Sequence, residues 1–252
     1  MKKSFSAFVK LLFTSLLLSQ FALAKDPLNS PVWSDTIKEM IGNDKFIFDD
    51  KNIKINVPAF ADNPLQVPIY IDASKIKDAK KLLVFADLNA IVKVADFDLQ
   101  NMKPVLSLNI KVAQGTPLRA VVQDSSGLWH VGSANINSFG GGCSVPSGAS
   151  NMENYEDLLG KTKSKVWKKK DFYRIKWSIF HPMETGLFVG NPSFYISDIN
   201  ITSNKKNIGK INLYGSVSEN PRIIFETKSG NGSYDLSIKD TDGNEFELST
   251  KI

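Results

Sequence analysis

The sequence predicts an all-β protein: two immunoglobulin-like β-sandwich domains, joined by a flexible linker and preceded by a short N-terminal helix. Short β-rich runs recur at regular spacing with turn residues between them, which is typical of sandwiches. Two sets of such runs, each about 100 residues long, flank residues 139–165, which are rich in Gly, Ser, Asn and Lys. Cys143 is the only cysteine, so no internal disulfide forms and each core depends on apolar burial.

Residues 1–24 have the pattern of a cleaved export signal. Three lysines precede the apolar run 11–18, and Ala22-Leu23-Ala24 fits signal peptidase. We expect cleavage after Ala24 and a periplasmic location, without a membrane anchor, because the apolar run is too short to span a bilayer. Losing the segment lowers the net charge from +5 to about +2. We therefore expect no nucleic-acid partner.

One helix is predicted at the start of the mature chain. Ser30 is the expected cap, Pro31 suits the first turn, and Gly42 ends the helix. The apolar residues that share one face are Trp33, Ile37, Met40 and Ile41.

The first set of strands falls within residues 25–138. The run 81–86 is apolar throughout and predicts a strand buried on both faces, whereas 105–112 alternates and predicts one wet face. A turn is expected at 124–127. The expected strands are 46–48, 53–57, 67–71, 81–86, 105–112, 118–123 and 128–137.

The second set falls within residues 166–252, after the linker at 139–165. Within the linker we expect only a helical turn near Tyr155–Leu159, ended by Gly160. Asp242-Gly243 predicts a hairpin between the last two strands. The expected strands are 172–180, 194–201, 208–214, 223–226, 234–238 and 246–248.

Cys143 is the strongest functional candidate in the sequence. It lies in Phe139-Gly140-Gly141-Gly142-Cys143-Ser144, where three glycines predict a mobile, exposed arm. A thiol reacts as the thiolate, and free cysteine has a pKa near ~8.5, so we expect a moderately reactive and highly accessible group. An extended arm from Phe139 to Cys143 spans up to roughly 17 Å and could place the sulfur in another protein's cleft.

Other chemistry is poorly represented. A cysteine hydrolase needs a base beside the thiol, and only His130 and His181 are available. For His181, which precedes Pro182, a ring bonded to the backbone of a turn is favoured over a base. No metal-ligand spacing, haem motif or nucleotide loop occurs. We expect a carrier without catalytic activity and without a metal or bound cofactor.

The two halves resemble the Y and Z subunits of the SoxYZ sulfur carrier of thiosulfate oxidation. The Y-like half carries the resemblance from Ile55 to Asn63, in Val67-Pro68-Ile69, in Leu118–Val122 with Gly127, and in Gly141-Gly142-Cys143. The Z-like half carries it in His181-Pro182-Met183-Glu184-Thr185-Gly186, in Val217–Pro221, which includes Asn220, and in Asp240–Gly243.

The resemblance implies immunoglobulin-like halves and a sulfur intermediate bound covalently to Cys143. It implies that a c-type cytochrome couples thiosulfate to the cysteine and that other Sox-type enzymes then process the bound sulfur. The Z-like half would support and dock, with His181, Pro182, Gly186, Asn220 and Pro221 as its motif residues.

The chain departs from the family in two places. The arm is followed by Ser144 and a second domain instead of ending the polypeptide, and Asp87-Leu88-Asn89-Ala90 lacks the usual Asn-Pro-x-Pro. Fused chains of this type also occur beside quinoprotein dehydrogenases. An accessory binding module for such an enzyme, or a structural two-domain module, therefore remains an alternative. The lysine-rich stretch Lys161–Lys170 is either a solvated face or a docking surface for an acidic protein.

Overall fold

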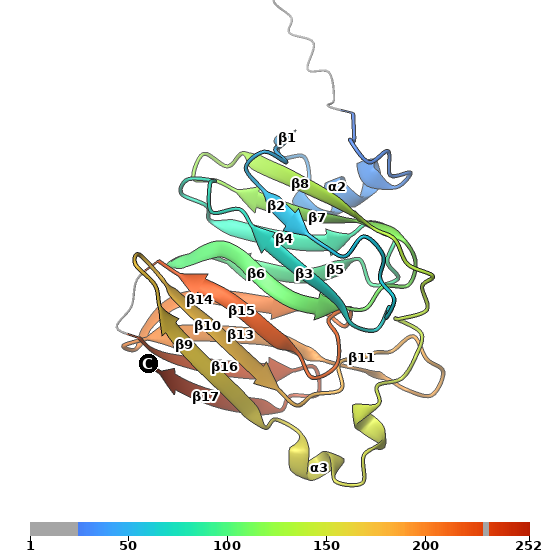
Figure 1. The fold of residues 1–252 in the computed structure, drawn as a ribbon, viewed down its shortest axis with the longest axis vertical. Helices are drawn as coiled ribbons and strands as arrows, with labels where there is room; N and C mark the ends of the chain where they lie inside the picture. The colour runs from blue at the N-terminus through green and yellow to red at the C-terminus, as the bar shows by residue number, and fades with distance from the viewer. Residues whose placement is uncertain (1–24, 229–231) are drawn as a thin grey trace, which may run out of the picture.

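The computed structural model of the protein describes residues 25–228 and 232–252, so the expected export signal lies outside the described residues. The fold is all-β and consists of two large stacked sheets (Figure 1). This confirms the fold class predicted from the sequence, including the short helix at the start. None of the helices that the structure describes is long and apolar enough to cross a membrane.

The larger sheet has nine strands in the spatial order β1-β8-β7-β4-β5-β14-β13-β16-β17. All of its pairs are antiparallel except β1 with β8. Its strands are β1 (Phe46–Phe48), β4 (Lys81–Ala86), β5 (Lys93–Asp98), β7 (Thr116–Gln123), β8 (Trp129–Ile136), β13 (Ile196–Ser203), β14 (Lys206–Leu213), β16 (Ser233–Asp240) and β17 (Glu245–Lys251).

The smaller of the two sheets has six strands in the order β2-β3-β6-β15-β10-β9. Its strands are β2 (Lys54–Asn56), β3 (Val67–Asp72), β6 (Met102–Ile110), β9 (Thr162–Lys168), β10 (Tyr173–Ile179) and β15 (Arg222–Thr227). Two short strands, β11 (Glu184–Thr185) and β12 (Ser193–Phe194), pair with each other beside these sheets.

The two halves of the chain join edge to edge in both sheets. β5 of the first half pairs with β14 of the second, and β6 pairs with β15. The buried side chains of both halves form one continuous cluster, in which Phe97 and Leu106 lie with Ile211 and Phe225. Figure 1 shows the first half in blue and green above the second in orange and red. The halves therefore share a core as well as their sheets.

The helix α2 (Trp33–Ile41) covers the outer face of the larger sheet. Trp33, Ile37 and Ile41 pack there against Phe85 and Trp129 in a second apolar cluster. Strand β4 consequently has both faces buried, as predicted, because Val84 belongs to the main core and Phe85 to the helix cluster.

The ends of α2 only partly match the prediction. Gly42 ends the helix with a left-handed φ of 69°. The expected cap at Ser30 is wrong: Val32 holds the cap position without a side-chain hydrogen bond, and the Ser30 hydroxyl is buried without a partner.

Arg119 anchors the segment that precedes α2. Its buried guanidinium pairs with Asp26 at 2.7 Å and with Asp87 at 2.8 Å, and it lies under the Trp33 ring. Asp26 also accepts hydrogen bonds from the backbone of Leu28 and Ser30. Because every oxygen of the two carboxylates faces a donor, this buried charge is well compensated.

Two strands of the large sheets were not predicted, and neither was the short strand β11 beside them. β5 was missed because its aspartates interrupt the apolar pattern, and β9 was missed because its lysines and serine resemble the linker. The alternation over 105–112 is also wrong at its end: Ser107 and Asn109 are half-buried, but Lys111, which follows in the same phase, is 2% exposed. It lies beyond the end of β6, where the second half covers it.

The connection between the halves contains a short 3-10 helix (Ala149–Asn151) and the helical turn α3 (Tyr155–Leu158). The turn agrees with the prediction, and Gly160 follows it with a φ of 78°.

Candidate functional site

Cys143 is buried where the two halves of the chain meet. Its exposure is 0%, and it is a free thiol. The sulfur donates a hydrogen bond to Oδ1 of Asn89 at 3.4 Å, and the Cys143 carbonyl accepts one from Oγ1 of Thr185 at 2.8 Å. The residue is thus held by one side chain from each half.

The glycines before Cys143 are bonded to the first half of the chain. Gly141 N donates to Ala113 O and Gly142 N donates to Val112 O, at 3.0 and 2.9 Å. A Cβ atom at Gly142 would lie 2.1 Å from Pro64 O, so only glycine fits at this close approach. We call residues 139–144 the cysteine segment.

Asn89 connects the cysteine segment to the sheet. Its Oδ1 accepts from Ala113 N at 2.7 Å as well as from the sulfur, and its Nδ2 donates to Lys111 O at 3.1 Å. The amide orientation is therefore fixed by its neighbours. Asn89 belongs to the stretch that departs from the family pattern, so its role could not be predicted from the resemblance.

Lys111 places a buried ammonium group near the thiol. Its Nζ donates to the carbonyl oxygen of Met183, and no carboxylate of the described residues lies within 4 Å of it. Burial lowers the pKa of Lys111, against the opposing effect of Glu184, Cys143 and Glu219. Buried charge that is not paired with an opposite charge is costly, which makes this lysine a candidate for function.

Burial and charge act in opposite directions on the thiol. Burial raises the pKa of Cys143, whereas the nearby Lys111 charge and the Asn89 hydrogen bond lower it; the net effect is a raised pKa. In the enclosed state the sulfur is therefore a protonated and weakly nucleophilic group at neutral pH.

The segment His181–Gly186 of the second half forms the wall beside Cys143. Met183 accepts from Lys111, Thr185 donates to Cys143, and Glu184 is 4% exposed. Glu184 Oε1 accepts from Ser147 N at 3.0 Å and from Ser150 Oγ at 2.8 Å, which fixes the chain just after the cysteine segment.

His181 is a structural part of this wall. Its Nδ1 accepts from Met183 N at 3.1 Å, as expected for a ring bonded to the backbone of a turn. Burial lowers its pKa to about 4, so the ring is neutral at pH 7. Its Nε2 lies 3.5 Å from Asp240 Oδ2 but has no hydrogen-bond partner, and this contact is not an ion pair while the ring is neutral.

The other motif residues of the second half lie around His181. Pro182 is buried. Asn220 Oδ1 accepts from His181 N at 3.1 Å, and Pro221 O accepts from Ile179 N. Gly186 has a left-handed φ of 76°, which suits glycine. These residues support the wall and do not touch the sulfur through any recorded hydrogen bond.

The predicted exposure of Cys143 is wrong. The three glycines were interpreted as a free arm, but their small size instead lets the segment lie against the backbone of residues 64, 112 and 113. The flanks behave differently: Phe139 is 96% exposed, and Ser144 is exposed. The cysteine segment is therefore exposed at its two ends and buried at the sulfur.

Lys111, Asn89 and Thr185 were missed as residues of the thiol site. Thr185 was quoted only as part of a motif. A lysine between Ile110 and Val112 is the one available signal, because it interrupts an apolar run at a strand end. The described residues contain no group of three or more His, Cys, Asp or Glu that could hold a metal.

Comparison with known proteins gives a consistent result. The family model "Sulfur oxidation protein SoxY" matches residues 37–143, and "Sulphur oxidation protein SoxZ" matches residues 162–251. A search of the curated proteins found no match.

Three solved structures illustrate the range of structural matches. The sulfur carrier protein SoxY from Chlorobium limicola f thiosulfatophilum is 29% identical, with a TM-score of 0.38 over 42% of this chain and 94% of that chain. A β-glycosidase from Bacteroides vulgatus is 7% identical, with a TM-score of 0.25 over 79% and 24%. A red sea bream transglutaminase is 9% identical, with a TM-score of 0.23 over 90% and 34%.

The first family model ends at Cys143, and the second begins at Thr162, the first residue of β9. With both models matched in tandem, the chain belongs to the SoxYZ family, as a SoxY domain and a SoxZ domain fused in one polypeptide.

Proposed function

We propose that this protein is an exported carrier that holds a sulfur intermediate of thiosulfate oxidation covalently on Cys143 while partner enzymes act on it. One observation carries the proposal: the SoxY match ends at a lone thiol, which side chains of both halves enclose. A thiol with no disulfide partner, on a segment held by hydrogen bonds from Gly141 and Gly142, suits a reversible attachment point. The periplasmic location rests on the export signal expected in residues 1–24.

The loading step is an oxidative coupling. The Cys143 thiol and thiosulfate give Cys143–S–S–SO₃⁻, releasing one proton and two electrons, which a c-type cytochrome accepts. Water then attacks the terminal sulfonate sulfur, which releases sulfate and two protons and leaves the persulfide Cys143–S–S⁻. Each step needs a partner enzyme of the Sox type, and the carrier supplies only the sulfur atom that holds the intermediate.

The absence of a base bonded to the thiol supports a carrier over an enzyme. Within the described residues, the only side-chain hydrogen bond of the sulfur goes to Asn89. The amide cannot take up a proton at neutral pH, so Cys143 lacks the paired base that a cysteine hydrolase requires.

Loading requires the cysteine segment to move out of its buried position. Four hydrogen bonds connect it to distant parts of the described chain: from Gly141 N, from Gly142 N, from Thr185 to the Cys143 carbonyl, and from the sulfur to Asn89. At about 1 kcal/mol each, they disfavour opening by several kcal/mol but do not prevent it. Opening also exposes the thiol to water, which lets its pKa fall toward the ordinary value.

Intact-mass spectrometry tests the proposal. The mature chain is incubated with thiosulfate and the thiosulfate-coupling c-type cytochrome from the same organism. We expect a mass increase of one S₂O₃ unit that a reductant removes and that Cys143→Ser abolishes. An unmodified Cys143 with every sulfur donor and cytochrome tried would contradict the carrier role.

The same assay separates the carrier from an accessory module of a quinoprotein dehydrogenase. A module of that kind would bind the dehydrogenase equally well in the wild-type chain and in Cys143→Ser, and it would not acquire a sulfur adduct. A purely structural module would tolerate Cys143→Ala without loss of function.

A further inference from the structure

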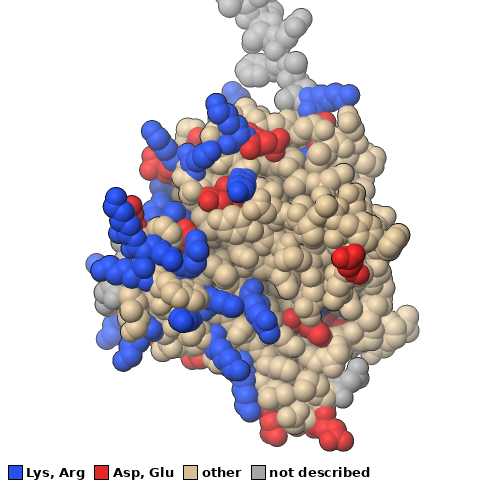
Figure 2. Space-filling model, in the orientation of Figure 1, with Lys and Arg blue, Asp and Glu red and all other residues tan. Residues whose placement is uncertain are grey.

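The outer face of the six-stranded sheet carries a cluster of positive charge on its β9 edge. Lys163 and Lys165 come from β9, Lys176 from β10 and Arg222 from β15. We call these four residues the basic face. All four are exposed, and Figure 2 shows Lys and Arg side chains over this part of the molecule and along the adjoining left edge of the view.

The strand register places like charges opposite one another on this face. Lys165 pairs directly with Lys176, and Ser178 lies between Lys163 and Arg222. Like charges at directly opposed positions of an antiparallel pair destabilise a sheet. The arrangement therefore costs stability, and a partner of opposite charge would remove that cost.

The positive charges in the neighbouring row of the same sheet are compensated by a carboxylate. Arg174 and Lys103 both pair with the buried carboxylate of Glu226, at 2.6 and 3.0 Å. Within the described residues, none of the four cations of the basic face has a carboxylate within 4 Å. The cations of the basic face therefore lack the ion pairs that compensate Arg174 and Lys103 in the neighbouring row.

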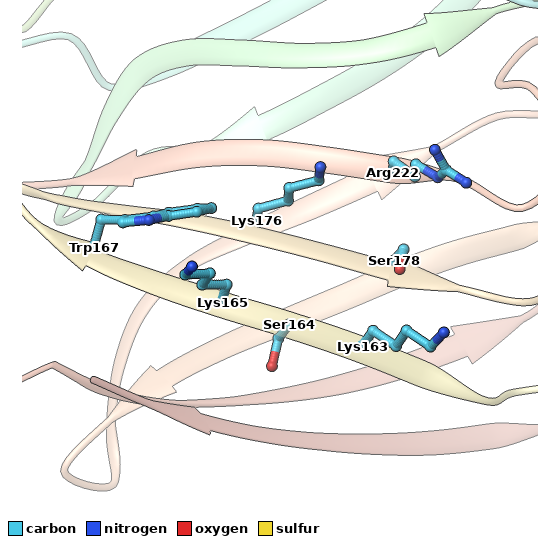
Figure 3. Close-up of a pocket in the computed structure, with 7 residues that line it drawn as sticks. All are labelled: Lys163, Ser164, Lys165, Trp167, Lys176, Ser178 and Arg222. Carbon is cyan, nitrogen blue, oxygen red and sulfur yellow. The ribbon is translucent and has the colours of Figure 1, made fainter.

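A shallow hollow lies among these side chains. Its volume is about 350 Å³, and its lining combines the basic face with Ser164, Trp167 and Ser178, without an acidic residue. Figure 3 shows the lysines and Trp167 extending from β9 and β10, with Arg222 at the far end on β15. Four cations around a hollow suit protruding carboxylates of another protein.

The basic face is connected to the thiol site through Arg222. That residue also lines a second hollow of about 140 Å³ together with Glu219 and Asn220. Glu219 accepts a hydrogen bond from Ala149 N, a few residues after Cys143, and Asn220 bonds His181. A protein that covers the basic face therefore comes to lie next to the chain that encloses the sulfur.

We propose that the basic face is the docking surface for an acidic partner protein, the one that acts on Cys143. This inference rests on the proposed carrier function. Opposite charges accelerate association and orient the partner, so the cluster brings the partner to the thiol site before the cysteine segment opens. An anionic membrane is less suited, because the cluster is small and surrounds a hollow instead of projecting as a longer polybasic segment.

The test measures association rates of Cys143→Ser chains with the thiosulfate-coupling cytochrome, so that docking is observed without covalent loading. We compare Lys165→Glu/Lys176→Glu with the control Lys51→Glu/Lys54→Glu, which makes the same charge change at the opposite edge of the sheet, where both lysines are exposed. We expect the basic-face variant to associate about tenfold more slowly at low salt, and the control to stay within about twofold of the parent chain.

Equal rates for the two double variants, or no binding of the cytochrome to any chain, would overturn the docking inference. So would loss of binding to phosphatidylglycerol vesicles in the basic-face variant alone, because that would identify a membrane surface. The loading assay with the wild-type thiol keeps the two proposals apart. If sulfur loads onto Cys143 and Lys165→Glu/Lys176→Glu does not change the loading, the docking inference is wrong and the carrier function stands. If docking depends on the charge but no sulfur loads, the carrier function is wrong and the docking surface stands.

Discussion

Two buried cations in the first half of the chain have opposite surroundings. Arg119 is 0% exposed and pairs with the carboxylates of Asp26 and Asp87. Lys111 is 2% exposed, and its Nζ donates to a carbonyl, that of Met183. Complete compensation is what a structural contact needs, whereas an undercompensated charge beside a thiol adjusts the chemistry of that thiol. The comparison separates a site that stabilises the fold from the thiol site that we propose to be functional.

Removing the guanidinium of Arg119 should have the largest effect. Arg119→Leu leaves two carboxylates enclosed without a counter-charge, and we expect a loss of about 3–5 kcal/mol in the free energy of unfolding, measured by urea denaturation. Arg222→Leu, at an exposed arginine, is the control and should change it by less than about 0.5 kcal/mol. Similar losses of unfolding free energy in both variants would show that the buried Arg119 ion pairs do not stabilise the fold more than an exposed arginine does.

Acid should weaken the wall beside Lys111 before it weakens the Arg119 cluster. The pKa of His181 is about 4 in the folded chain and 6.5 as a model value, so the unfolded chain binds the extra proton first and stability falls between about pH 6.5 and pH 4. The loss is on the order of 3 kcal/mol.

Asp26 behaves differently. Burial raises its pKa, but hydrogen bonds from Arg119, Ser30 and Leu28 outweigh burial and leave the pKa below 3.8. Its contribution is therefore present above pH 3.8 and is lost below it. Unfolding curves of the wild-type chain and His181→Gln at several pH values check both pH ranges, the one between 6.5 and 4 for His181 and the one below 3.8 for Asp26. A wild-type slope between pH 6.5 and 4 that His181→Gln retains would contradict the role of His181.

Replacing Lys111 should change the thiol more than the fold. Lys111→Met keeps most of the volume and removes an undercompensated charge, so we expect the free energy of unfolding to stay the same or to increase, by on the order of 1 kcal/mol. The positive charge that lowers the pKa of Cys143 is then absent. The pH profile of iodoacetamide alkylation should shift to higher pH. An unchanged profile would mean that Lys111 does not act on the sulfur.

The smallest effect is expected at Thr185. Thr185→Val removes the hydrogen bond to the Cys143 carbonyl, at a cost of about 1 kcal/mol. Because the same bond holds the cysteine segment closed, alkylation of Cys143 should become about fivefold faster. Thr250→Val on β17 is the matched control, and it should leave the alkylation rate unchanged. A slower or equal rate in Thr185→Val would show that this bond does not limit opening.

Much of the fold could be predicted because alternation and turn residues act locally. The runs 46–48 and 81–86 and the helix ended by Gly42 correspond closely to the observed elements. β9 was missed because an edge strand with one buried residue, Val166, has little apolar signal. β5 was missed for a related reason: the partner that makes it a central strand, β14, lies more than 100 residues away in the sequence.

The sequence analysis identified Cys143 as the residue of the thiol site but did not predict that it is buried. Gly-Gly-Cys and the segment His181–Gly186 were both identified, yet nothing in the sequence shows that they touch. Their contact depends on Asn89, Lys111 and Thr185, which come from three separate parts of the chain. Local composition indicates how freely a backbone can move, but it does not indicate which distant surface that backbone packs against.

The order of the amino acids was enough to predict the all-β class, the tandem of two family-like halves and Cys143 as the single thiol. Folding in three dimensions was needed to show that the halves share sheets and core, that the sulfur is enclosed, and that Lys165 faces Lys176. The reason is physical: hydrophobic periodicity is a property of neighbouring residues, whereas burial, cross-strand charge and pKa arise from residues that only folding brings together.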